Sequence, residues 1–479
     1  MLLLDEQERL TLWKTVVDII ETYARQVSEH RVTPDLDPER IRGLLKRFDF
    51  KQPIDPQEAV RFAADSLWEH QVHTPHPRYY GLFNPAPTTM GIAADTLVAA
   101  FNPQMAAWSH NPFAAEVERH LLRSFGPLFG YRAEDTDGAF ASGGAEANHT
   151  ALLTALVHSF PEFAKHGVRA LPRQPVLYVS SEGHHTFLKA ARLCGLGTEA
   201  VREIDVDNNL RMDLTALDAR MRADLEQDLA PFLVVGTAGT TSAGVVDDLQ
   251  TLATIARSHQ LWFHADAAWG GAAALAPELR PVLRGIEDAD SITFDAHKWL
   301  SVPMGAGIYL TRHPEILEKT FRTDTAYMPR DAEGLDIVDP FAHTMQWSRR
   351  FIGLKVFLSL AVAGWDGYAT AIRHQAAMGD LLKQSLAASG WKAVNETPLP
   401  VVCFVDGTRP EGRSAEYLSK VAGEIVRSGQ AWISTTRLGG SIPVIRACIT
   451  NYRTGRDDIA ALVAALNNAR QKLTSPIGG

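Results

Sequence analysis

A chain of 479 residues exceeds what one hydrophobic core usually organises, so we expect two or three domains. Its 46% hydrophobic and 22% charged residues are typical of a globular protein, and a net charge of −9 without any basic block argues against nucleic acid or an anionic membrane as a partner. Three scattered cysteines exclude a disulfide framework and a CxxC metal site, and no apolar run reaches the roughly 20 residues of a membrane span, which together predict a soluble, cytoplasmic protein.

Residues 1–87 are predicted to form a helical N-terminal segment. An amphipathic helix is expected over residues 5–30, with one apolar face made of Trp13, Val16, Val17, Ile20, Tyr23, Ala24 and Val27. Such a face must be covered by the main body or by a second subunit. A second helix is expected over Glu58–His70, and a turn-rich run follows from His73 to Pro87.

Residues 88–348 alternate short apolar strands with helices. The clearest strands are expected at Val176–Ser180, Phe232–Gly236, Leu261–His264, Ile292–Phe294 and Gly307–Leu310. Helices are expected between them, for example at Thr186–Cys194 and Leu249–His259. This alternation predicts an α/β fold with a largely parallel sheet and helices on both faces. In such sheets ligands bind at the carboxyl ends of the strands.

Residues 349–479 are predicted to form a smaller C-terminal α/β domain. A long helix from Arg350 to about Gly367 leads into it. Strands are then expected at Val401–Val405, Ala431–Thr435 and Val444–Thr450, and helices at Glu416–Arg427 and Asp457–Lys472.

Three strand ends carry unusual residues. Lys298 follows a short apolar run, where a buried ammonium is costly unless the lysine is neutralised, for instance as a Schiff base. The small residues of Ser142-Gly-Gly-Ala-Glu-Ala-Asn148 open a helix and favour an anion, although a plain glycine turn explains them equally well. Asp266 ends a buried strand and needs a cationic, proton-donating or backbone partner. A phosphate cradle, a carboxylate for a ring nitrogen and a lysine for an aldehyde together indicate pyridoxal phosphate.

His184 and His185 follow the strand at Val176–Ser180. Adjacent residues on a helix do not share a face, and no third ligand or HExxH pattern accompanies them, so we expect no metal site. One of the two is suited to stacking on a flat ring, while two loop histidines without a role remain an alternative.

These residues resemble the pyridoxal-phosphate-dependent group II amino-acid decarboxylases, a family that includes the aromatic-L-amino-acid and glutamate decarboxylases. The resemblance extends from His76-Pro-Arg-Tyr-Tyr80 to Arg446-Ala-Cys-Ile-Thr-Asn451, and its most specific motif is Asp295-Ala-His-Lys-Trp299. It implies the pyridoxal-phosphate-dependent transferase fold type I, with a mainly parallel seven-stranded sheet sandwiched by helices. It also implies a homodimer with active sites at the subunit interface and the N-terminal segment packing across it.

The resemblance implies a role for each matching residue. The cofactor would be bound by Gly144, Ala145, His184, Thr241, Asp266, Ala268, Asp295, His297 and Lys298. Lys298 would form the internal aldimine, Asp266 would bind the pyridinium nitrogen, and His184 and Ala268 would lie on opposite faces of the ring. Asp247 would support the site, and Arg446 would bind the substrate α-carboxylate.

Tyr327 lies in a polar stretch that resembles the family's mobile catalytic loop. The resemblance implies that this loop reaches the partner subunit's active site and that Tyr327 protonates the quinonoid intermediate at Cα after carbon dioxide leaves. Relatives with phenylalanine at this place tend toward oxidative aldehyde formation.

The substrate is expected to be an aromatic or otherwise bulky L-amino acid, bound by Leu82, Phe83, Gln104 and Arg446. Leu82 and Ala106 stand where aromatic decarboxylases usually carry aromatic residues, so the pocket is expected to be wider or more polar, with Asn84, Gln104 and His110 as polar contacts. An acidic or diamino substrate stays open, as does an aldehyde synthase or aminotransferase of the same fold. A scaffold protein without catalysis is disfavoured because Lys298, Asp266 and Tyr327 are all present.

Overall fold

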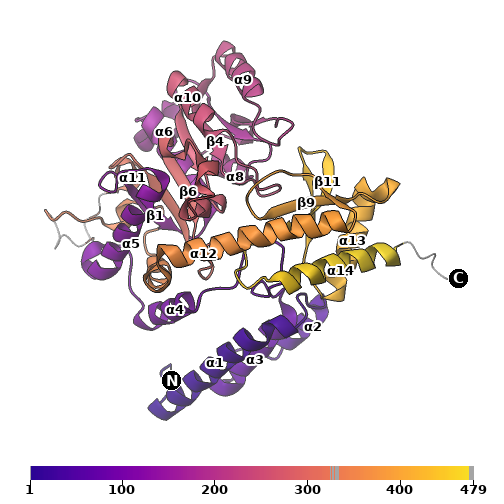
Figure 1. Cartoon of the computed structure of the whole chain (residues 1–479). Helices are drawn as coiled ribbons and strands as arrows, with labels where there is room; N and C mark the ends of the chain where they lie inside the picture. The colour runs from indigo at the N-terminus through magenta and orange to yellow at the C-terminus, as the bar shows by residue number, and fades with distance from the viewer. Residues whose placement is uncertain (1, 324, 326–327, 329–333, 474–479) are drawn as a thin grey trace.

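A computed structural model describes residues 2–323, 325, 328 and 334–473, with three groups of elements (Figure 1). The N-terminal group is helical and consists of α1 (Glu6–Gln26), α2 (Pro38–Leu45) and α3 (Pro56–His70). Each of the three begins at an aspartate whose side chain accepts a backbone N–H of the first turn. Within α1, Trp13 and Val17 are each 56% exposed, so part of the predicted apolar face is open within one chain. The rest is covered in part: Tyr23 packs against Trp68 of α3, and Val27, just after the helix, is fully buried.

The central group is built around a seven-stranded sheet with the order β1-β7-β6-β5-β4-β2-β3. Its strands are β1 (Asp137–Ala141), β2 (Pro175–Ser180), β3 (Val201–Ile204), β4 (Ala230–Thr237), β5 (Trp262–Asp266), β6 (Ser291–Asp295) and β7 (Gly307–Thr311). Only β7 is antiparallel to its neighbours, and the other six strands run in one direction. The prediction of a mainly parallel seven-stranded α/β sheet is therefore confirmed.

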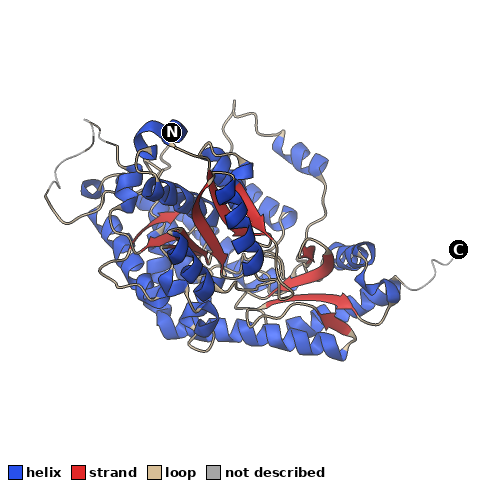
Figure 2. Cartoon of the chain, turned by 90° about the horizontal axis from the view of Figure 1, so that it is seen from above, coloured by secondary structure: helices blue, strands red, loops and turns tan. Residues whose placement is uncertain are grey.

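Helices cover both faces of this sheet, as Figure 2 shows. The helices of the central group are α4 (Thr89–Phe101), α5 (Pro112–Phe125), α6 (Gly144–Ser159), α7 (Phe163–His166), α8 (Thr186–Leu193), α9 (Leu214–Glu226), α10 (Leu249–His259) and α11 (Ile316–Phe321). Of these, α5, α6, α8, α9 and α10 pack directly on strands of the sheet. Because both faces are covered, every residue of β2, β5 and β6 is buried. Their polar side chains must therefore find partners inside the protein, which concentrates hydrogen bonds at the strand ends.

The C-terminal group follows α12 (Gly353–Ala388), which spans the central and C-terminal groups in Figure 1. Its four-stranded antiparallel sheet has the order β10-β11-β9-β8, and two helices pack with it. The elements are β8 (Trp391–Ala393), β9 (Val401–Asp406), α13 (Ala415–Ser428), β10 (Ser434–Leu438), β11 (Ile442–Cys448) and α14 (Arg456–Lys472). None of the helices in the described ranges is both long and apolar enough to cross a membrane.

Two expectations for this group require correction. The helix expected to end near Gly367 is interrupted at Gly364, whose φ of 65° is not helical, but a second helical segment that was not expected follows directly and extends α12 to Ala388. The strand expected at Ala431–Thr435 begins three residues later, as β10. The reason is the turn at Gly439 and Gly440, with φ values of 52° and 66°, which sets the register of β10 against β11.

Candidate active site

The carboxyl ends of the co-directional strands bring the predicted cofactor residues to one edge of the large sheet. β1 leads into Gly144, the first residue of α6, while β5 ends at Asp266 and β6 ends at Asp295. β5 lies between β4 and β6, with Asp266 opposite Thr237 on one side and Thr293 on the other. The sheet topology thus collects residues that are more than 100 positions apart in the chain.

Lys298 lies in a tight turn directly after β6. Its Nζ is 2.9 Å from Oδ2 of Asp295, and the two side chains are 22% and 1% exposed. Behind the turn, Lys355 is buried and donates hydrogen bonds to the carbonyl groups of Pro303 and Met304, at 3.3 and 3.1 Å. The lysine is therefore held on a well-anchored loop, with a buried carboxylate beside its ammonium.

The N-terminus of α6 forms a cradle with no room for larger side chains. A Cβ atom on Gly144 would lie 2.7 Å from Oδ2 of Asp295 and 3.3 Å from the Cβ of Ala268, so this position requires glycine. No side chain caps the helix at Gly143, which leaves the first N–H groups of α6, including that of Ala145, available to an anion.

His297 completes this cradle. Its Nδ1 accepts the N–H of Ala306 at 3.1 Å, so in the neutral ring Nε2 carries the proton and is a donor. Burial lowers the pKa of His297, which favours this neutral form. Uncapped amide groups, an imidazole donor and a glycine forced by close contact fit a phosphate group, and the neighbouring lysine fits an aldehyde, as pyridoxal phosphate requires.

Asp266 is buried and both of its oxygens are hydrogen-bonded. Oδ2 accepts from Nδ2 of Asn148 at 2.8 Å, and Oδ1 accepts from the N–H of Ala268 at 3.2 Å. Carboxylate oxygens have further lone pairs, so Asp266 retains capacity for a ring N–H⁺. The motif that ends at Asn148 was singled out in the sequence for its small residues, but the asparagine itself received no role.

A cleft of about 530 Å³ separates the loops after β2 and β4 from the β10–β11 hairpin. Arg446 of β11 lines it and is only 3% exposed; its Nε donates to the carbonyl group of Thr241 at 2.8 Å, and its Nη1 donates to that of Gly81 at 2.9 Å. Its guanidinium lies 5.0 Å from the ring centroid of Phe83, which stacks on Trp269 at 4.4 Å. Nη2 is buried and has no hydrogen-bond partner within the described part of the chain. A buried cation with a spare donor is suited to a carboxylate.

His184 is exposed to this cleft, and its Nδ1 accepts the N–H of Thr186 at 3.3 Å. Desolvation by the surrounding protein lowers the pKa of His184, and the Lys298 ammonium lowers it further, while the Asp266 carboxylate acts in the opposite direction. His184 therefore lies within electrostatic reach of both predicted cofactor residues, as stacking on a ring between them would require.

Glu182 is a residue of the cleft that the sequence did not point to. Its Oε1 accepts the N–H of Gly439 at 2.6 Å, and its Oε2 accepts the hydroxyl of Ser242. Glu182 therefore ties the loop after β2 to the hairpin of the small sheet. A single acidic residue beside two histidines gives no sequence signal for such a contact.

The remaining predicted residues are placed as follows. Leu82 lines the cleft and is 54% exposed, whereas Gln104 and His110 are exposed and are not among its lining residues. Asp247 lies behind the loop after β4 and accepts the N–H groups of Thr237 and Met212, at 2.8 and 2.7 Å; burial raises its pKa to about 6. Tyr327 lies outside the described residues.

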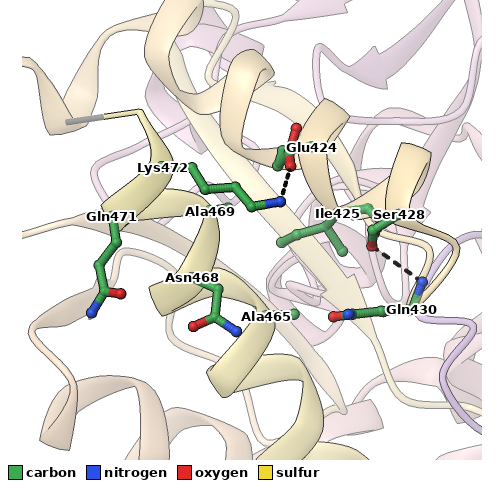
Figure 3. Close-up of a pocket in the computed structure, with 9 residues that line it drawn as sticks. All are labelled: Glu424, Ile425, Ser428, Gln430, Ala465, Asn468, Ala469, Gln471 and Lys472. Atoms are coloured by element: carbon green, nitrogen blue, oxygen red, sulfur yellow. Dashed lines mark hydrogen bonds and ion pairs between the residues drawn. The ribbon is translucent and has the colours of Figure 1, made fainter. Parts of the chain in front are cut away.

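A second groove, of about 490 Å³, lies between α13 and α14 (Figure 3). Lys472 pairs with Glu424 at 2.6 Å, and the N–H of Gln430 donates to Oγ of Ser428 at 3.3 Å, so several of its polar groups satisfy one another. Figure 1 shows α13 and α14 well away from β6, and the groove contains none of the predicted site residues. This groove is therefore separate from the cleft that His184 and Arg446 line.

Comparison with known proteins gives one family and several relatives. The family model of the pyridoxal-dependent decarboxylase conserved domain matches residues 42–406. An aromatic-L-amino-acid decarboxylase of Bacillus atrophaeus is 29% identical over 98% of this chain and 97% of its own length. A tyrosine decarboxylase of Oryza sativa subsp. japonica is 31% identical over 86% of this chain and 79% of its own length. An acidic amino acid decarboxylase of Bos taurus is 27% identical over 89% of this chain and 84% of its own length.

Solved structures share the fold over nearly the whole chain. Mouse CSAD is 25% identical with a TM-score of 0.90, covering 97% of this chain and 99% of its own. The 4-hydroxyphenylacetaldehyde synthase of Rhodiola rosea is 25% identical with a TM-score of 0.87, covering 98% of this chain and 100% of its own. Proteins named for different substrates and different products therefore share this architecture.

Proposed function

Because this chain belongs to the pyridoxal-dependent decarboxylase family, with residues 42–406 matching its conserved domain, we propose that it decarboxylates an L-amino acid with an aromatic or otherwise bulky side chain. The chain is a pyridoxal-phosphate-dependent amino-acid decarboxylase, and the choice of substrate and the roles of its residues are the proposal. The observation that carries these roles is the position of His184, which lines the cleft together with Arg446 and lies within electrostatic reach of Asp266 and Lys298.

Bound pyridoxal phosphate supplies an aldehyde that condenses with amines and a ring that takes up the electron pair released as carbon dioxide leaves. In our assignment Lys298 holds the aldehyde carbon, and the cradle of Gly144, Ala145 and His297 holds the phosphate. Asp266 keeps the ring nitrogen protonated, because a buried carboxylate stabilises an adjacent cation. The protein thereby deepens the electron sink without taking part in the bond cleavage itself.

Arg446 is assigned to the α-carboxylate of the substrate. Its Nη2 has no hydrogen-bond partner among the described residues, while Nε and Nη1 are already fixed by carbonyl groups of two separate loops. A guanidinium anchored in this way sets the direction of the carboxylate and so of the bond to be broken. Its burial keeps the ion pair away from water, which strengthens it.

The preference for a bulky side chain rests on the aromatic wall beside Arg446. Phe83 is buried, stacks on Trp269 and faces the guanidinium, while Leu82 presents an apolar side chain to the cleft. The relatives in Bacillus atrophaeus and Oryza sativa are named for aromatic amino acids, which supports the same choice.

An acidic amino acid is the second candidate substrate. Arg437 lines the cleft in addition to Arg446, so a second cation is available there for a side-chain carboxylate. The relative in Bos taurus is named for acidic amino acids. This candidate shares every cofactor residue with the first and differs only in what the far side of the cleft binds.

A panel of L-amino acids with the holoenzyme tests both candidates, with carbon dioxide and amine measured for each. We expect the highest kcat/KM for aromatic side chains. A higher value for aspartate or glutamate would replace the first candidate by the second. Stoichiometric aldehyde instead of amine would make the protein an aldehyde synthase, and a keto-acid product would make it an aminotransferase.

We also propose that the protein is a homodimer and that Tyr327 donates the proton to Cα in the partner's site. The exposed Trp13 and Val17 on α1 support an intersubunit contact, because an apolar helix face of this kind is stable when covered. The mass in solution, measured for the wild type and for Trp13→Ser/Val17→Ser, tests the dimer: the wild type is expected at twice the chain mass. Tyr327→Phe is expected to retain the cofactor and lose amine; unchanged amine output would remove Tyr327 from the reaction.

A further inference from the structure

Five polar side chains, the last of them that of Asp266, form a continuous buried chain of hydrogen bonds. Nε1 of Trp262 lies 2.8 Å from Oγ of Ser291, and this oxygen lies 2.8 Å from Nδ1 of His264. Nε2 of His264 lies 3.2 Å from Oδ1 of Asn148, and Nδ2 of Asn148 lies 2.8 Å from Oδ2 of Asp266. The chain joins β5, β6 and α6, and each of its five residues is at most 5% exposed.

The carboxylate end sets the direction of the hydrogen bonds. An ionised carboxylate only accepts, so the Asn148 amide donates to Asp266 and its Oδ1 accepts from Nε2 of His264, which also lies 3.3 Å from Oγ1 of Thr293. A neutral ring with its proton on Nε2 accepts at Nδ1, so Ser291 donates to it. The indole N–H of Trp262, which is only a donor, is compatible with this order because the serine oxygen also accepts.

The middle of the chain agrees with this order. Burial lowers the pKa of His264 to about 4, so its ring is neutral at neutral pH and has one donor and one acceptor nitrogen. The second N–H of the Asn148 amide has its own acceptor, Oγ1 of Thr186 at 3.0 Å. The asparagine therefore cannot rotate its amide without losing two hydrogen bonds and placing an oxygen against a carboxylate.

We propose that Asn148 and His264 are positioning residues that hold the Asp266 carboxylate, through this directional chain, as the acceptor for the ring nitrogen of the cofactor. The inference rests on the proposed pairing of Asp266 with that nitrogen. Hydrogen bonds in a buried chain polarise one another, so loss of a distant member weakens the last one. The orientation of Asp266 is thus set by residues that touch neither cofactor nor substrate.

The test measures binding of two ligands by the apoprotein: pyridoxal phosphate and its analogue with C–H in place of the ring nitrogen. The second ligand fills the same space and keeps the phosphate and the aldehyde, but it cannot pair with Asp266. The variants are Asn148→Leu, which removes the hydrogen bond to Asp266, and Ser291→Ala, which removes the hydrogen bond to His264 on the far side of Asn148. Tyr178→Phe is the matched control, because Tyr178 lies on β2 of the same sheet and the variant deletes its buried hydrogen bond to another carboxylate, that of Asp224 on α9.

We expect the wild type and Tyr178→Phe to bind pyridoxal phosphate more tightly than the analogue. Asn148→Leu should lose about 10-fold or more of that preference, as for a hydrogen bond to a charged group, while its affinity for the analogue stays within about twofold. Ser291→Ala should lose a smaller part of the preference for pyridoxal phosphate over the analogue.

Two outcomes overturn the inference. One is that Asn148→Leu keeps the full preference for pyridoxal phosphate over the analogue. The other is that it loses affinity for both ligands equally, which would give the hydrogen-bond chain only a structural role. No preference in the wild type would instead remove the proposed pairing of Asp266 itself. The ring-nitrogen ¹⁵N chemical shift of labelled cofactor provides a second readout: it should move toward the unprotonated form in Asn148→Leu and stay unchanged in Tyr178→Phe.

Discussion

The two sheets contribute to the cleft in different ways. At the edge of the large sheet, Asp266 and Asn148 are held by several hydrogen bonds each, and the neighbouring loop is pinned by Lys355. The small sheet supplies essentially one buried group, Arg446, which retains a donor without a partner in the described chain. One side is a closed polar network, and the other presents an open binding group.

In our assignment, this difference separates the residues that hold the cofactor from the residues that recognise the substrate. A network in which each group fixes the next tolerates little change, which suits a cofactor whose geometry must be constant. A single anchored cation and a few cleft side chains can accept different partners. Relatives named for aromatic and for acidic amino acids share the fold, as expected if substrate choice depends on the open side.

The strongest test concerns the network side, that is, the edge of the large sheet, and uses the variant Lys298→Ala. Because Lys298 is assigned to the aldehyde of the cofactor, we expect turnover to fall by at least ~10³-fold. The visible absorbance of the lysine-bound cofactor should disappear as well. Retained turnover would remove Lys298 from the chemistry and with it the assignment of this side of the cleft.

A pH series on His264→Gln tests whether His264 stays neutral inside the hydrogen-bond network of the folded protein. His264 takes up a proton at about pH 6.5 when unfolded and at about pH 4 when folded, so the unfolded state binds more protons between these values. The free energy of unfolding of the wild type should therefore fall as the pH drops from 7 to 4.5, and this residue should account for about 2–3 kcal/mol. The variant should show a correspondingly smaller fall in denaturant titrations. Equal falls would mean that His264 is not kept neutral in the folded protein.

Arg446→Lys tests the open side. A lysine keeps the charge but loses the fork that holds Thr241, Gly81 and the substrate together, so KM should rise by about 10–100-fold. The Kd of pyridoxal phosphate should stay within about twofold. Arg437→Gln is the matched control: it should leave an aromatic substrate unaffected, whereas a loss confined to acidic amino acids would favour the second candidate. An equal loss of cofactor affinity in Arg446→Lys would contradict the separation of the two sides.

The smallest expected effect concerns Glu182, which links the large-sheet and small-sheet sides of the cleft. In Glu182→Gln, the amide keeps one acceptor for the N–H of Gly439 but loses the negative charge that strengthens both hydrogen bonds. We expect KM to rise by about two- to fivefold, as for the loss of roughly 0.5–1 kcal/mol, with kcat unchanged. A change in cofactor absorbance would show that this link also supports the network side.

Much of the large sheet was predictable because its signals are local. Short apolar strands that alternate with helices specify a parallel sheet, and a parallel sheet specifies one edge where ligands bind. The strand before Asp266 and the turn that carries Lys298 therefore followed from the sequence. β1 was expected only as a strand end before Ser142, without bounds, because its five residues, Asp137–Ala141, contain no β-branched residue and a glycine.

What the sequence by itself determined is the fold class, and it also supplied the candidate site residues, since both depend on periodicity and on motifs within a few residues of each strand end. Only the tertiary structure decided which distant groups meet: Arg446 binds a carbonyl group 205 residues away, and Glu182 binds the N–H of Gly439, 257 residues away. It also turned Asn148 and His264, two motif residues without an assigned role, into consecutive members of one chain. Such contacts depend on how the two sheets and α6 pack together, which no local pattern in the sequence encodes.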